Sequence, residues 1–404
     1  MVSTFDLSLR HLDAALAVLR QGSISSASAA VNLSQPALTQ ALAKLEALVG
    51  HRLFDRQPSG ASPTQAGHLF LARVERGLER IIDSGRRLRR SARLKPIAYL
   101  ERLVSMGQLH ALAAVEKAGS YSLAAREIGL SQPSVHRAVK ELEAILGLPL
   151  VFRAGRSMRP TPAGMRLVSA IRLMAAELQA GFDELAALEQ AGAGTIRIGA
   201  LPLPRAGLLP EALAGFTRNR PSIAITIIEG PYSDLLAALR NGEIDMVVGA
   251  LRDPAPTRDV LQRPLFEDDL FIVARSRHPL AGSNDPNPAD LASYPWVIGA
   301  QGSPMRARWE ALFIESELPT RRIECSSILM ARWLLLDGDW LALMSTDQFR
   351  IEQASGLLAP IGGPVQGSRR QIGVTIRADW LPTAAQADLL SELTAAGAKR
   401  SSGI

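Results

Sequence analysis

The chain contains two copies of one segment, placed 97 positions apart. Residues 12–67 align with residues 109–164 without a gap, and 23 of the 56 aligned pairs are identical. The identical pairs combine turn residues, helix caps and apolar positions, and include Gly22/Gly119, Ser34/Ser131, Gln35/Gln132, Pro36/Pro133, Glu46/Glu143, Gly50/Gly147, Arg56/Arg153, Thr64/Thr161 and Gly67/Gly164. Chance similarity would not preserve all three kinds of position together, so the repeat indicates a duplicated structural module.

The best-marked element of the second copy is a helix that we expect to begin after Ser131. Ser131 is a good N-cap, and Pro133 falls in the first turn, where its missing N–H costs nothing. Apolar residues then recur at three- and four-residue spacing, which predicts a buried stripe of Val135, Val139, Leu142 and Leu146. A short helix within residues 120–130 precedes it and is closed by Gly129. Two short helices joined by a tight turn indicate a helix-turn-helix, whose second helix reads the major groove of DNA.

The side chains that lie off the buried stripe are the candidate DNA contacts. In the second copy they are Ser131, Gln132, Pro133, Ser134, His136, Arg137 and Lys140. In the first copy they are Ser34, Gln35, Thr39, Gln40 and Lys44. Arginine can bond guanine through two donors and glutamine can bond adenine, whereas alanine offers only a methyl contact. We therefore expect the second helix to be the better-equipped reader, and the first to read weakly, extend the footprint or serve in assembly.

A two-strand wing is predicted after each reading helix, beginning at residues 53–56 and 150–153. Arg56, Arg153 and Arg156 are placed there to reach phosphates or a minor groove. For any one of these arginines, a solvated position on a basic hairpin is an equally good interpretation.

These motifs carry a family resemblance. Gly-Ser ahead of an alanine-rich helix, then Ser-Gln-Pro, Leu-Glu and Leu-Gly, and a wing that ends in Thr-Pro-Ala-Gly resemble the winged helix-turn-helix of LysR-type transcriptional regulators. The resemblance is specific in residues 107–190, and the C-terminal half fits it as well. It implies a regulator that binds double-stranded DNA, forms a homodimer or homotetramer and contacts RNA polymerase. Family members normally carry one such module, so residues 1–95 depart from the pattern.

A long amphipathic helix is predicted after each module. Residues 162–190 place apolar side chains at helical spacing, namely Met165, Val168, Ile171, Met174, Leu178, Phe182, Leu185 and Leu188. Residues 68–94 repeat the design with Leu71, Val74, Leu78, Ile81 and Leu88. In the family the matching helix pairs two chains, and we hypothesise that here the two helices pair within one chain as a pseudo-dimeric DNA reader. The basic run of residues 86–96 either touches the DNA backbone or is a solvated linker, with equal support for each.

Residues 191–404 change character, from short helices to alternating strands and helices. After a linker at 191–194, strands are predicted at 195–199, 223–228 and 245–249, with helices at 206–219 and 232–241 between them. This alternation indicates a parallel α/β domain, and the mostly apolar run 223–228 indicates a fully buried strand. A second lobe is expected to contain the strands 270–274, 296–298, 322–324 and 341–344, before strand 372–376 and helix 383–396 return to the first lobe. Two such lobes place a ligand cleft between them.

The predicted architecture is a multidomain α/β chain with five parts. They are a first winged helix-turn-helix domain (1–67), a first linker helix (68–95), a second winged helix-turn-helix domain (96–164), a linker and dimerisation helix (165–192) and a two-lobed, periplasmic-binding-protein-like effector domain (193–404). Within the last part, lobe I comprises residues 193–270 and 365–404, and lobe II comprises residues 271–364.

Residues 242–251 and 264–275 resemble the effector domain of the same family, which is itself similar to periplasmic solute-binding proteins. By their positions after the predicted strands, the expected effector contacts are Leu203, Pro204, Pro231, Tyr232, Ala250, Ser303, Ser327, Met344 and Ser345. Free N–H groups of a helix opened by Ser303 would hold a carboxylate, although a simple N-cap is the somewhat better interpretation of that residue alone. The expected effector is an aromatic acid or a sugar-related anion, because the resemblance extends to regulators of galactose-binding-protein expression and of aromatic-acid breakdown.

Composition bears on the other classes of function. The net charge is +8 over residues 1–190 and −2 over residues 191–404, as expected for a nucleic-acid-binding end joined to a different domain. The single cysteine, Cys325, and the scattered histidines suggest no metal site, and we find no nucleophile elbow or phosphate-cradling loop. We therefore expect no enzyme and no cofactor. Without a secretory signal or a run of about 18 apolar residues, we expect a cytoplasmic protein with no membrane partner.

Two other functions remain open at this level. A solute-binding protein would need a signal sequence and would not need helix-turn-helix modules. An architectural protein that bridges DNA with its two modules fits the same motifs, and effector-dependent DNA binding separates it from a regulator.

Overall fold

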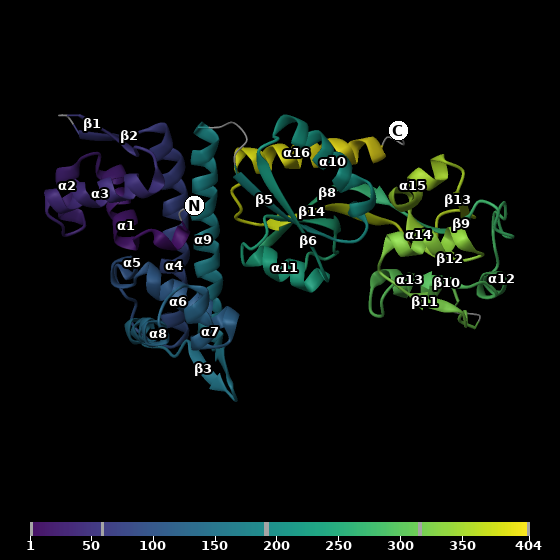
Figure 1. Ribbon diagram of the computed structural model, residues 1–404, viewed down its shortest axis with the longest axis horizontal. Helices are drawn as coiled ribbons and strands as arrows, with labels where there is room; N and C mark the ends of the chain where they lie inside the picture. The colour runs from purple at the N-terminus through teal and green to yellow at the C-terminus, as the bar shows by residue number, and fades with distance from the viewer. Residues whose placement is uncertain (1–2, 58–59, 190–193, 314–316, 402–404) are drawn as a thin grey trace. The chain divides into compact units, whose positions relative to one another are not determined.

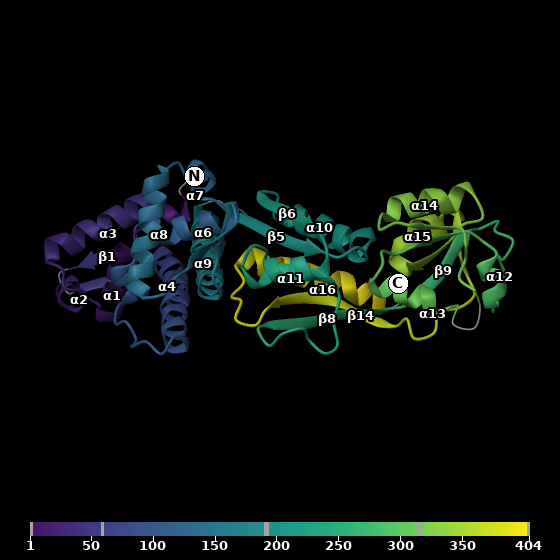
Figure 2. The ribbon, with the colours of Figure 1, turned by 90° about the horizontal axis from the view of Figure 1, so that it is seen from below.

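The computed structural model describes residues 3–57, 60–189, 194–313 and 317–401 (Figures 1 and 2). It forms two compact units. The N-terminal unit comprises residues 1–195 with residues 222–224 and 240–243, and the C-terminal unit comprises residues 196–221, 225–239 and 244–404. The side chain of Arg56 and most of the predicted linker 191–194 lie outside the described residues. Within the described part, no helix combines the length and the hydropathy needed to cross a bilayer.

The N-terminal unit contains the same series of elements twice. The first series is α1 (Leu9–Gln21), α2 (Ile24–Ala30), α3 (Gln35–Val49), the hairpin β1 (Phe54–Gln57) and β2 (Gly60–Pro63), and the long helix α4 (Gln65–Ser91). The second series is α6 (Met106–Ala118), α7 (Tyr121–Glu127), α8 (Gln132–Leu146), the hairpin β3 (Val151–Ala154) and β4 (Ser157–Pro160), and the long helix α9 (Pro162–Glu189). The short helices η1 (Thr4–Asp6) and α5 (Leu100–Leu103) precede the two series.

The predicted caps and the predicted stripe are both present. The Ser34 Oγ accepts a hydrogen bond from the Ala37 N–H at 3.3 Å, and the Ser131 Oγ accepts one from the Ser134 N–H at 3.2 Å. Each satisfies a backbone donor that the first turn of a helix leaves unpaired. The predicted stripe of α8 is confirmed, because all four of its members are buried: Val135, Val139, Leu142 and Leu146.

Two residue pairs that are identical in the two copies, Glu46/Glu143 and Gly67/Gly164, hold each wing close to the helices on either side of it. Glu143 Oε1 accepts hydrogen bonds from the backbone N–H groups of Leu150 and Val151, at 2.7 and 3.2 Å, and Glu46 makes the same pair of bonds in the first copy. At Gly164 a Cβ atom would lie 1.9 Å from the carbonyl oxygen of Leu150, so only glycine fits the close approach of helix and wing. Gly67 meets the corresponding carbonyl in the first copy.

The long helices α4 and α9 pack against each other in opposite directions (Figures 1 and 2). Gly77 faces Met174, and Gly181 faces Phe70, with 3.3 and 3.0 Å between the position of a glycine Cβ and the nearest side-chain carbon. The hypothesis that the two linker helices pair within one chain is therefore confirmed. The seam is shorter than predicted, because Met165 at one end of α9 is 60% exposed and Leu188 at the other end is 39% exposed.

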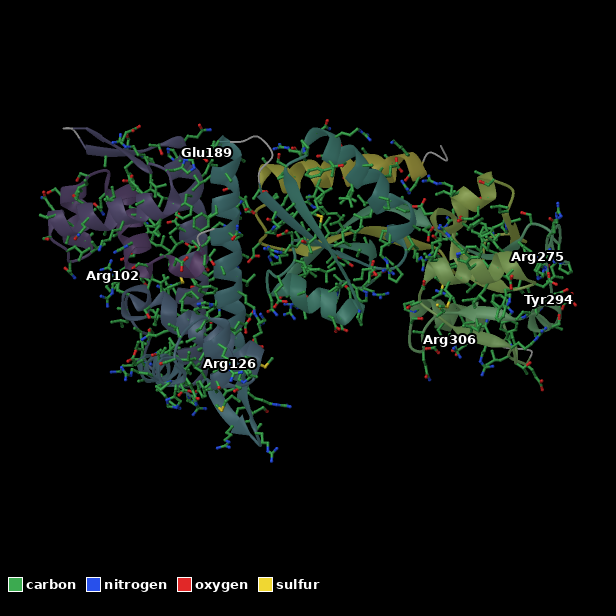
Figure 3. All side chains as sticks on the ribbon, viewed as in Figure 1. Arg102, Arg126, Glu189, Arg275, Tyr294 and Arg306 are labelled. Carbon is green, nitrogen blue, oxygen red and sulfur yellow. The ribbon has the colours of Figure 1, made fainter. Side chains whose placement is uncertain are left out.

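The two series share one hydrophobic core, which runs from Leu7 to Leu185. Polar contacts and ring stacking add to this union. Arg102, which is labelled in Figure 3, donates from its Nε to Asp13 Oδ2 at 2.7 Å and from its Nη1 to the Ala30 carbonyl at 3.2 Å. The Phe5 ring stacks on the His110 ring with 4.1 Å between centroids. The two modules of the N-terminal unit are thus packed into one domain and are not separate domains joined by a linker.

The C-terminal unit contains two five-stranded sheets. The sheet of lobe I has the order β6-β5-β7-β14-β8, formed by β5 (Gly194–Ala200), β6 (Ile223–Glu229), β7 (Met246–Ala250), β8 (Val260–Asp268) and β14 (Arg370–Arg377). Its helices are η2 (Pro204–Ala206), α10 (Leu208–Asn219), α11 (Tyr232–Arg240) and α16 (Ala384–Ser401). The sheet of lobe II has the order β11-β10-β12-β9-β13, formed by β9 (Leu270–Arg275), β10 (Trp296–Ile298), β11 (Arg322–Glu324), β12 (Leu341–Ser345) and β13 (Leu358–Ile361). Its helices are α12 (Pro288–Ala292), α13 (Pro304–Ala311), α14 (Ile328–Asp337) and α15 (Thr346–Ala354).

Two expectations for this unit were wrong. The sheets are mixed rather than parallel: β5 pairs with β7 and β10 with β12 in parallel, but β14, β9 and β13 run antiparallel to their neighbours because the chain crosses between lobes twice. The apolar strand β6 is not fully buried. It lies at the edge of its sheet, where only Ile223 is buried and Ile227 is exposed.

A buried carboxylate stands where the chain leaves lobe I. Asp268 ends β8, and its side chain is almost fully buried beside Arg370, whose Nη2 donates to Asp268 Oδ2 at 3.0 Å. Burial raises the pKa of Asp268 to about 6, against the opposing charge of Arg370, and the negative charges of Asp347 and Asp269 add to the increase. The folded chain therefore holds this proton up to a higher pH than an unfolded aspartate does.

This carboxylate should make stability fall as the pH rises from about 4 to about 6, because the folded state binds more protons than the unfolded state in that window. We expect Asp268→Asn to remove up to about 3 kcal/mol of this dependence. Urea unfolding of the full chain at several pH values measures it. Asp388→Asn is the matched control, since that exposed carboxylate pairs with Arg220 and does not act on Asp268. Parallel pH profiles of wild type and Asp268→Asn would contradict the expectation.

Candidate DNA-reading and effector sites

The predicted reading faces are turned to the solvent in both copies. On α8 every predicted contact is exposed: Ser131, Gln132, Pro133, Ser134, His136, Arg137 and Lys140. On α3 the predicted contacts Ser34, Gln35, Gln40 and Lys44 are exposed, and Thr39 is half-buried. The packing stripe thus places these side chains where a DNA groove can reach them.

Neighbouring side chains hold part of the α8 face in place. The Tyr121 ring at the start of α7 meets the His136 ring edge-on, with 5.0 Å between centroids. Lys140 Nζ lies 2.7 Å from Glu143 Oε2, and the other oxygen of this carboxylate accepts the hydrogen bond from the Leu150 N–H at the start of the wing. Arg137 has no ion pair or hydrogen bond with any residue that the structure describes. Its five donors are therefore available to a base edge or a phosphate.

The second wing presents basic side chains next to this face. Arg153 and Arg156 are exposed on the β3–β4 hairpin, and Arg153 Nε donates to the Gly155 carbonyl at 3.1 Å. This bond leaves the Arg153 Nη groups free to reach a phosphate. The predicted contact Arg56 of the first wing has its side chain outside the described residues.

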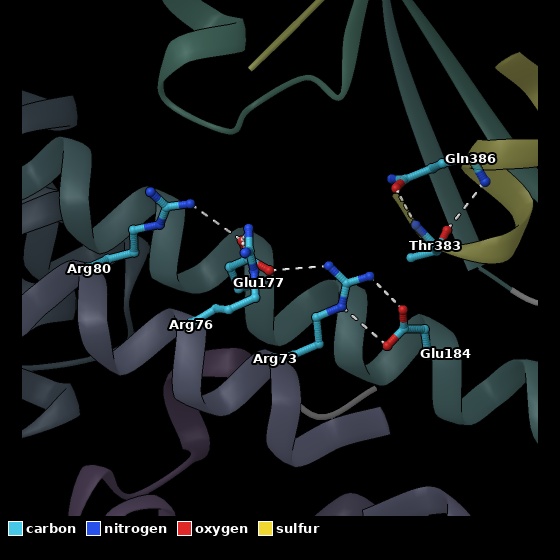
Figure 4. A network of polar contacts seen from close by, with 7 residues as sticks. All are labelled: Arg73, Arg76, Arg80, Glu177, Glu184, Thr383 and Gln386. Atoms are coloured by element: carbon cyan, nitrogen blue, oxygen red, sulfur yellow. Dashed lines mark hydrogen bonds and ion pairs between the residues drawn. The ribbon is translucent and has the colours of Figure 1, made fainter. Parts of the chain in front are cut away.

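A network of charges, which was not predicted from the sequence, lies in the contact between α4 and α9 (Figure 4). The Arg73 side chain is 2% exposed. Its Nη1 donates to Glu177 Oε2 at 3.2 Å, and its Nη2 donates to Glu184 Oε1 at 2.5 Å. Burial opposes the charge of Arg73, but the bonds and charges of Glu184 and Glu177 outweigh it and raise the pKa of the guanidinium. Arg76 Nη2 adds a bond to Glu177 Oε1 at 2.9 Å, and Arg80 Nη2 lies 3.6 Å from the same oxygen.

The sequence did contain a signal for this network. Arg73, Arg76 and Arg80 recur at helical spacing beside the apolar seam of α4, and Glu177 and Glu184 recur seven apart on α9. Charges at such spacing along a packing seam indicate a partner of opposite charge.

The predicted effector contacts fall into a buried set and an accessible set. Leu203, Pro204 and Ser345 are buried, and Met344 packs in the core of lobe II. The prediction that Met344 faces the cleft is therefore wrong, because the alternation along β12 turns it into the core beneath α14 and α15. The accessible set comprises Pro231, Tyr232, Ala250, Ser303 and Ser327.

The accessible residues sit at the ends of strands or the starts of helices. Pro231 precedes α11, and Tyr232 begins it with its ring under the Arg252 guanidinium, 4.6 Å from the ring centroid. Ala250 ends β7, and Ser327 caps α14 by accepting from the Met330 N–H at 3.3 Å. These positions match the expected edge of the sheets.

Ser303 lines a cavity of about 270 Å³ at the start of α13. Its Oγ accepts from the Arg306 N–H at 3.2 Å, so it is an N-cap as the alternative interpretation held. Arg306, which the sequence analysis missed, also lines the cavity, and its Nε donates to Glu310 Oε1 at 2.7 Å. The N-terminal helix charge and Arg306 favour an anion there, while Glu310 opposes one.

Comparison with known proteins agrees with this geometry. The model of the LysR substrate binding domain matches residues 189–398. The model of the bacterial regulatory helix-turn-helix protein, lysR family, matches twice, at residues 9–68 and 106–165. The chain therefore belongs to the LysR family of bacterial transcriptional regulators, which bind DNA and small-molecule effectors and form oligomers.

Individual relatives differ in how much of the chain they match. The HTH-type transcriptional regulator GalR of Pseudomonas putida is 31% identical over 385 residues, which cover 95% of this chain and 96% of GalR. The regulator PcaQ of Agrobacterium fabrum is 28% identical over 287 residues, which cover 70% of this chain and 92% of PcaQ. Among solved structures, ArgP from Mycobacterium tuberculosis has a TM-score of 0.56 at 20% identity and covers 72% of this chain and 96% of its own, which shows a shared fold.

Proposed function

We propose that this protein is an effector-responsive transcription regulator in which a single chain carries two winged helix-turn-helix modules that read DNA as a pair. The packing of α4 on α9 carries the proposal. It joins the modules through one core and leaves both reading faces exposed. In this arrangement one chain presents the two reading helices that a symmetric dimer presents with two chains.

The charges across the seam support pairing within the chain over pairing between like helices. Under the 97-residue repeat, Arg80 and Glu177 are equivalent positions, and they face each other across the seam. Two copies of α4 packed in the same register would place Arg80 against Arg80, and two copies of α9 would place Glu177 against Glu177. Like charges in a buried contact are costly, so the sequence favours the α4–α9 pair over either homotypic pair.

Self-association would then use other surfaces. Helix α14 exposes Leu329, Met330 and Trp333, and β6 has a sheet edge. Apolar side chains on one helix face together with an unpaired strand edge favour a protein–protein contact. We propose that two copies of the effector domain pair through these surfaces to form a homodimer or a homotetramer, and that RNA polymerase is a further partner of the DNA-bound assembly.

The proposed effector is a small anion held at Ser303, where the Ser303 hydroxyl and the Arg306 side chain lie in the cavity wall. Binding there would bring the two lobes together around the ligand. Closure would change the spacing of DNA-reading modules in the oligomer and so alter transcription. An architectural DNA-bridging protein would lack this response.

Loss of the Ser303 hydroxyl should weaken effector binding by about tenfold, because a hydrogen bond to an anion is lost. We would titrate the full chain, with and without operator DNA, with a panel of aromatic acids and sugar acids and follow thermal unfolding. With Ser303→Ala, the active compound should reach half of its effect on the unfolding temperature only at a higher concentration than with the wild type. The control is Asn287→Ala, which removes a similar N-cap from α12 away from the cavity. If no compound changes DNA binding, the chain fits the role of an architectural DNA-bridging protein and not that of an effector-responsive regulator.

A further inference from the structure

A second, larger cavity lies at the opposite edge of the lobe II sheet. Its volume is about 550 Å³, and its walls include Tyr294, Arg321, Arg322, Asp339 and Trp340. The strands β11 and β12 both run parallel to β10, so their first residues share one edge of the sheet and their last residues share the other. The cavity residues directly precede or begin these three strands, whereas Ser303 follows β10. The two cavities are therefore separate sites.

Two guanidinium groups give the second cavity its charge. Arg321 Nη2 donates to the Ser293 carbonyl at 3.3 Å, and Arg322 Nη1 donates to the Pro319 carbonyl at 2.8 Å. Neither has a carboxylate partner among the described residues. The one acidic lining residue, Asp339, is already occupied, because Arg275 Nε and Nη2 donate to its Oδ1 at 2.9 and 2.6 Å. The cavity thus carries a net positive charge and unused donors.

Aromatic rings form another part of the wall. Tyr294 packs against the buried His278 ring, with 4.5 Å between centroids. Trp340 stands one residue before β12, next to the Asp339–Arg275 pair. A half-buried aromatic ring held by a neighbouring ring offers a flat apolar surface at low cost in side-chain entropy.

We propose that this cavity binds a small aromatic carboxylate, with the carboxylate group at Arg321 and Arg322 and the ring against Tyr294 and Trp340. A guanidinium group suits a carboxylate because one arginine can offer it two parallel bonds. The volume lies within the range of small-molecule sites. The site is distinct from the one at Ser303 and does not depend on the function proposed above.

The test is equilibrium dialysis of the full chain against labelled phthalate, with benzoate and inorganic phosphate as competitors. We expect saturable binding of phthalate with a Kd of about 1 mM or tighter. Arg321→Gln/Arg322→Gln should weaken phthalate binding by about tenfold or more. The affinity of Arg321→Lys/Arg322→Lys should lie between that of the wild type and that of the double glutamine variant. Arg350→Gln, a change at an exposed arginine of α15, should leave phthalate binding unchanged.

Three results would overturn the proposal. They are the absence of saturable binding, equal binding by the double glutamine variant, and loss of binding in Ser303→Ala, which would place phthalate in the other cavity. If inorganic phosphate competes as strongly as benzoate, the cavity is a simple anion site, and the proposed contact of an aromatic ring with Tyr294 and Trp340 is wrong. Because both arginines are exposed, the variants should keep the wild-type circular dichroism spectrum, which confirms that a loss of binding is local.

Discussion

Arg73→Ala should lower the free energy of unfolding of the N-terminal unit by about 3–5 kcal/mol. The Arg73 side chain is buried between Glu177 and Glu184. Its removal takes the Arg73 partner from Glu184, in a contact that water reaches poorly, whereas Glu177 keeps Arg76 and Arg80. An uncompensated buried charge costs far more than the lost ion pair is worth. Urea denaturation of the full chain, followed by helical circular dichroism, measures the change.

A matched control and a combined variant sharpen this result. Arg20→Ala breaks an ion pair to Glu75 of similar length, 2.7 Å, but both partners are exposed, so we expect a loss of less than about 1 kcal/mol. Arg73→Met combined with Glu177→Gln and Glu184→Gln should cost less than the sum of the single changes, because no buried charge is stranded. An Arg73→Ala cost as small as that of Arg20→Ala would show that α4 and α9 do not rely on this contact.

His136→Ala/Arg137→Ala should weaken operator binding by about tenfold to a hundredfold. Both side chains are exposed on α8, and Arg137 has five donors that no described residue engages. Loss of a bidentate base contact removes discrimination as well as affinity. Gel-shift titration at fixed salt measures the change, since the phosphate contribution varies with salt concentration.

The corresponding variant of the first module, Gln40→Ala/Lys44→Ala, should have a smaller effect on affinity. Glutamine makes a weaker contact than arginine, and Lys44 contributes a single point charge. Arg350→Ala in α15 provides a control for loss of an exposed arginine outside the reading faces. Unchanged operator binding by the His136/Arg137 variant would show that α8 is not a reading helix.

Local patterns in the sequence predicted the N-terminal unit well. Caps such as Ser131 and the stripe that contains Val135 depend on residues three or four positions apart, so a repeat period and a capping preference suffice to locate them. The pairing of α4 with α9 followed from two apolar seams with no other evident partner. The identity of the buried charges did not, because the partners Arg73 and Glu184 are more than a hundred positions apart.

The effector domain was predicted less completely, for a related reason. Strand positions were found from apolar runs, but an apolar run does not reveal whether a strand is central or at an edge, and β6 is at an edge. The assignment of Met344 to the cleft rested on its position in the strand alone, without the alternation that turns it into the core. The cavity at Arg321 lies at the amino ends of strands, where the general rule for α/β sheets gives no reason to look.

The most direct test of the central claim, that one chain reads DNA with both modules, is a footprint on the DNA upstream of this gene. Wild type would be compared with His136→Ala/Arg137→Ala and with Gln40→Ala/Lys44→Ala. Our account predicts that each variant loses protection over a different half-site and keeps it over the other. Full wild-type protection by the Gln40/Lys44 variant, with all protection lost in the His136/Arg137 variant, would contradict it and leave the first module with a role in assembly only.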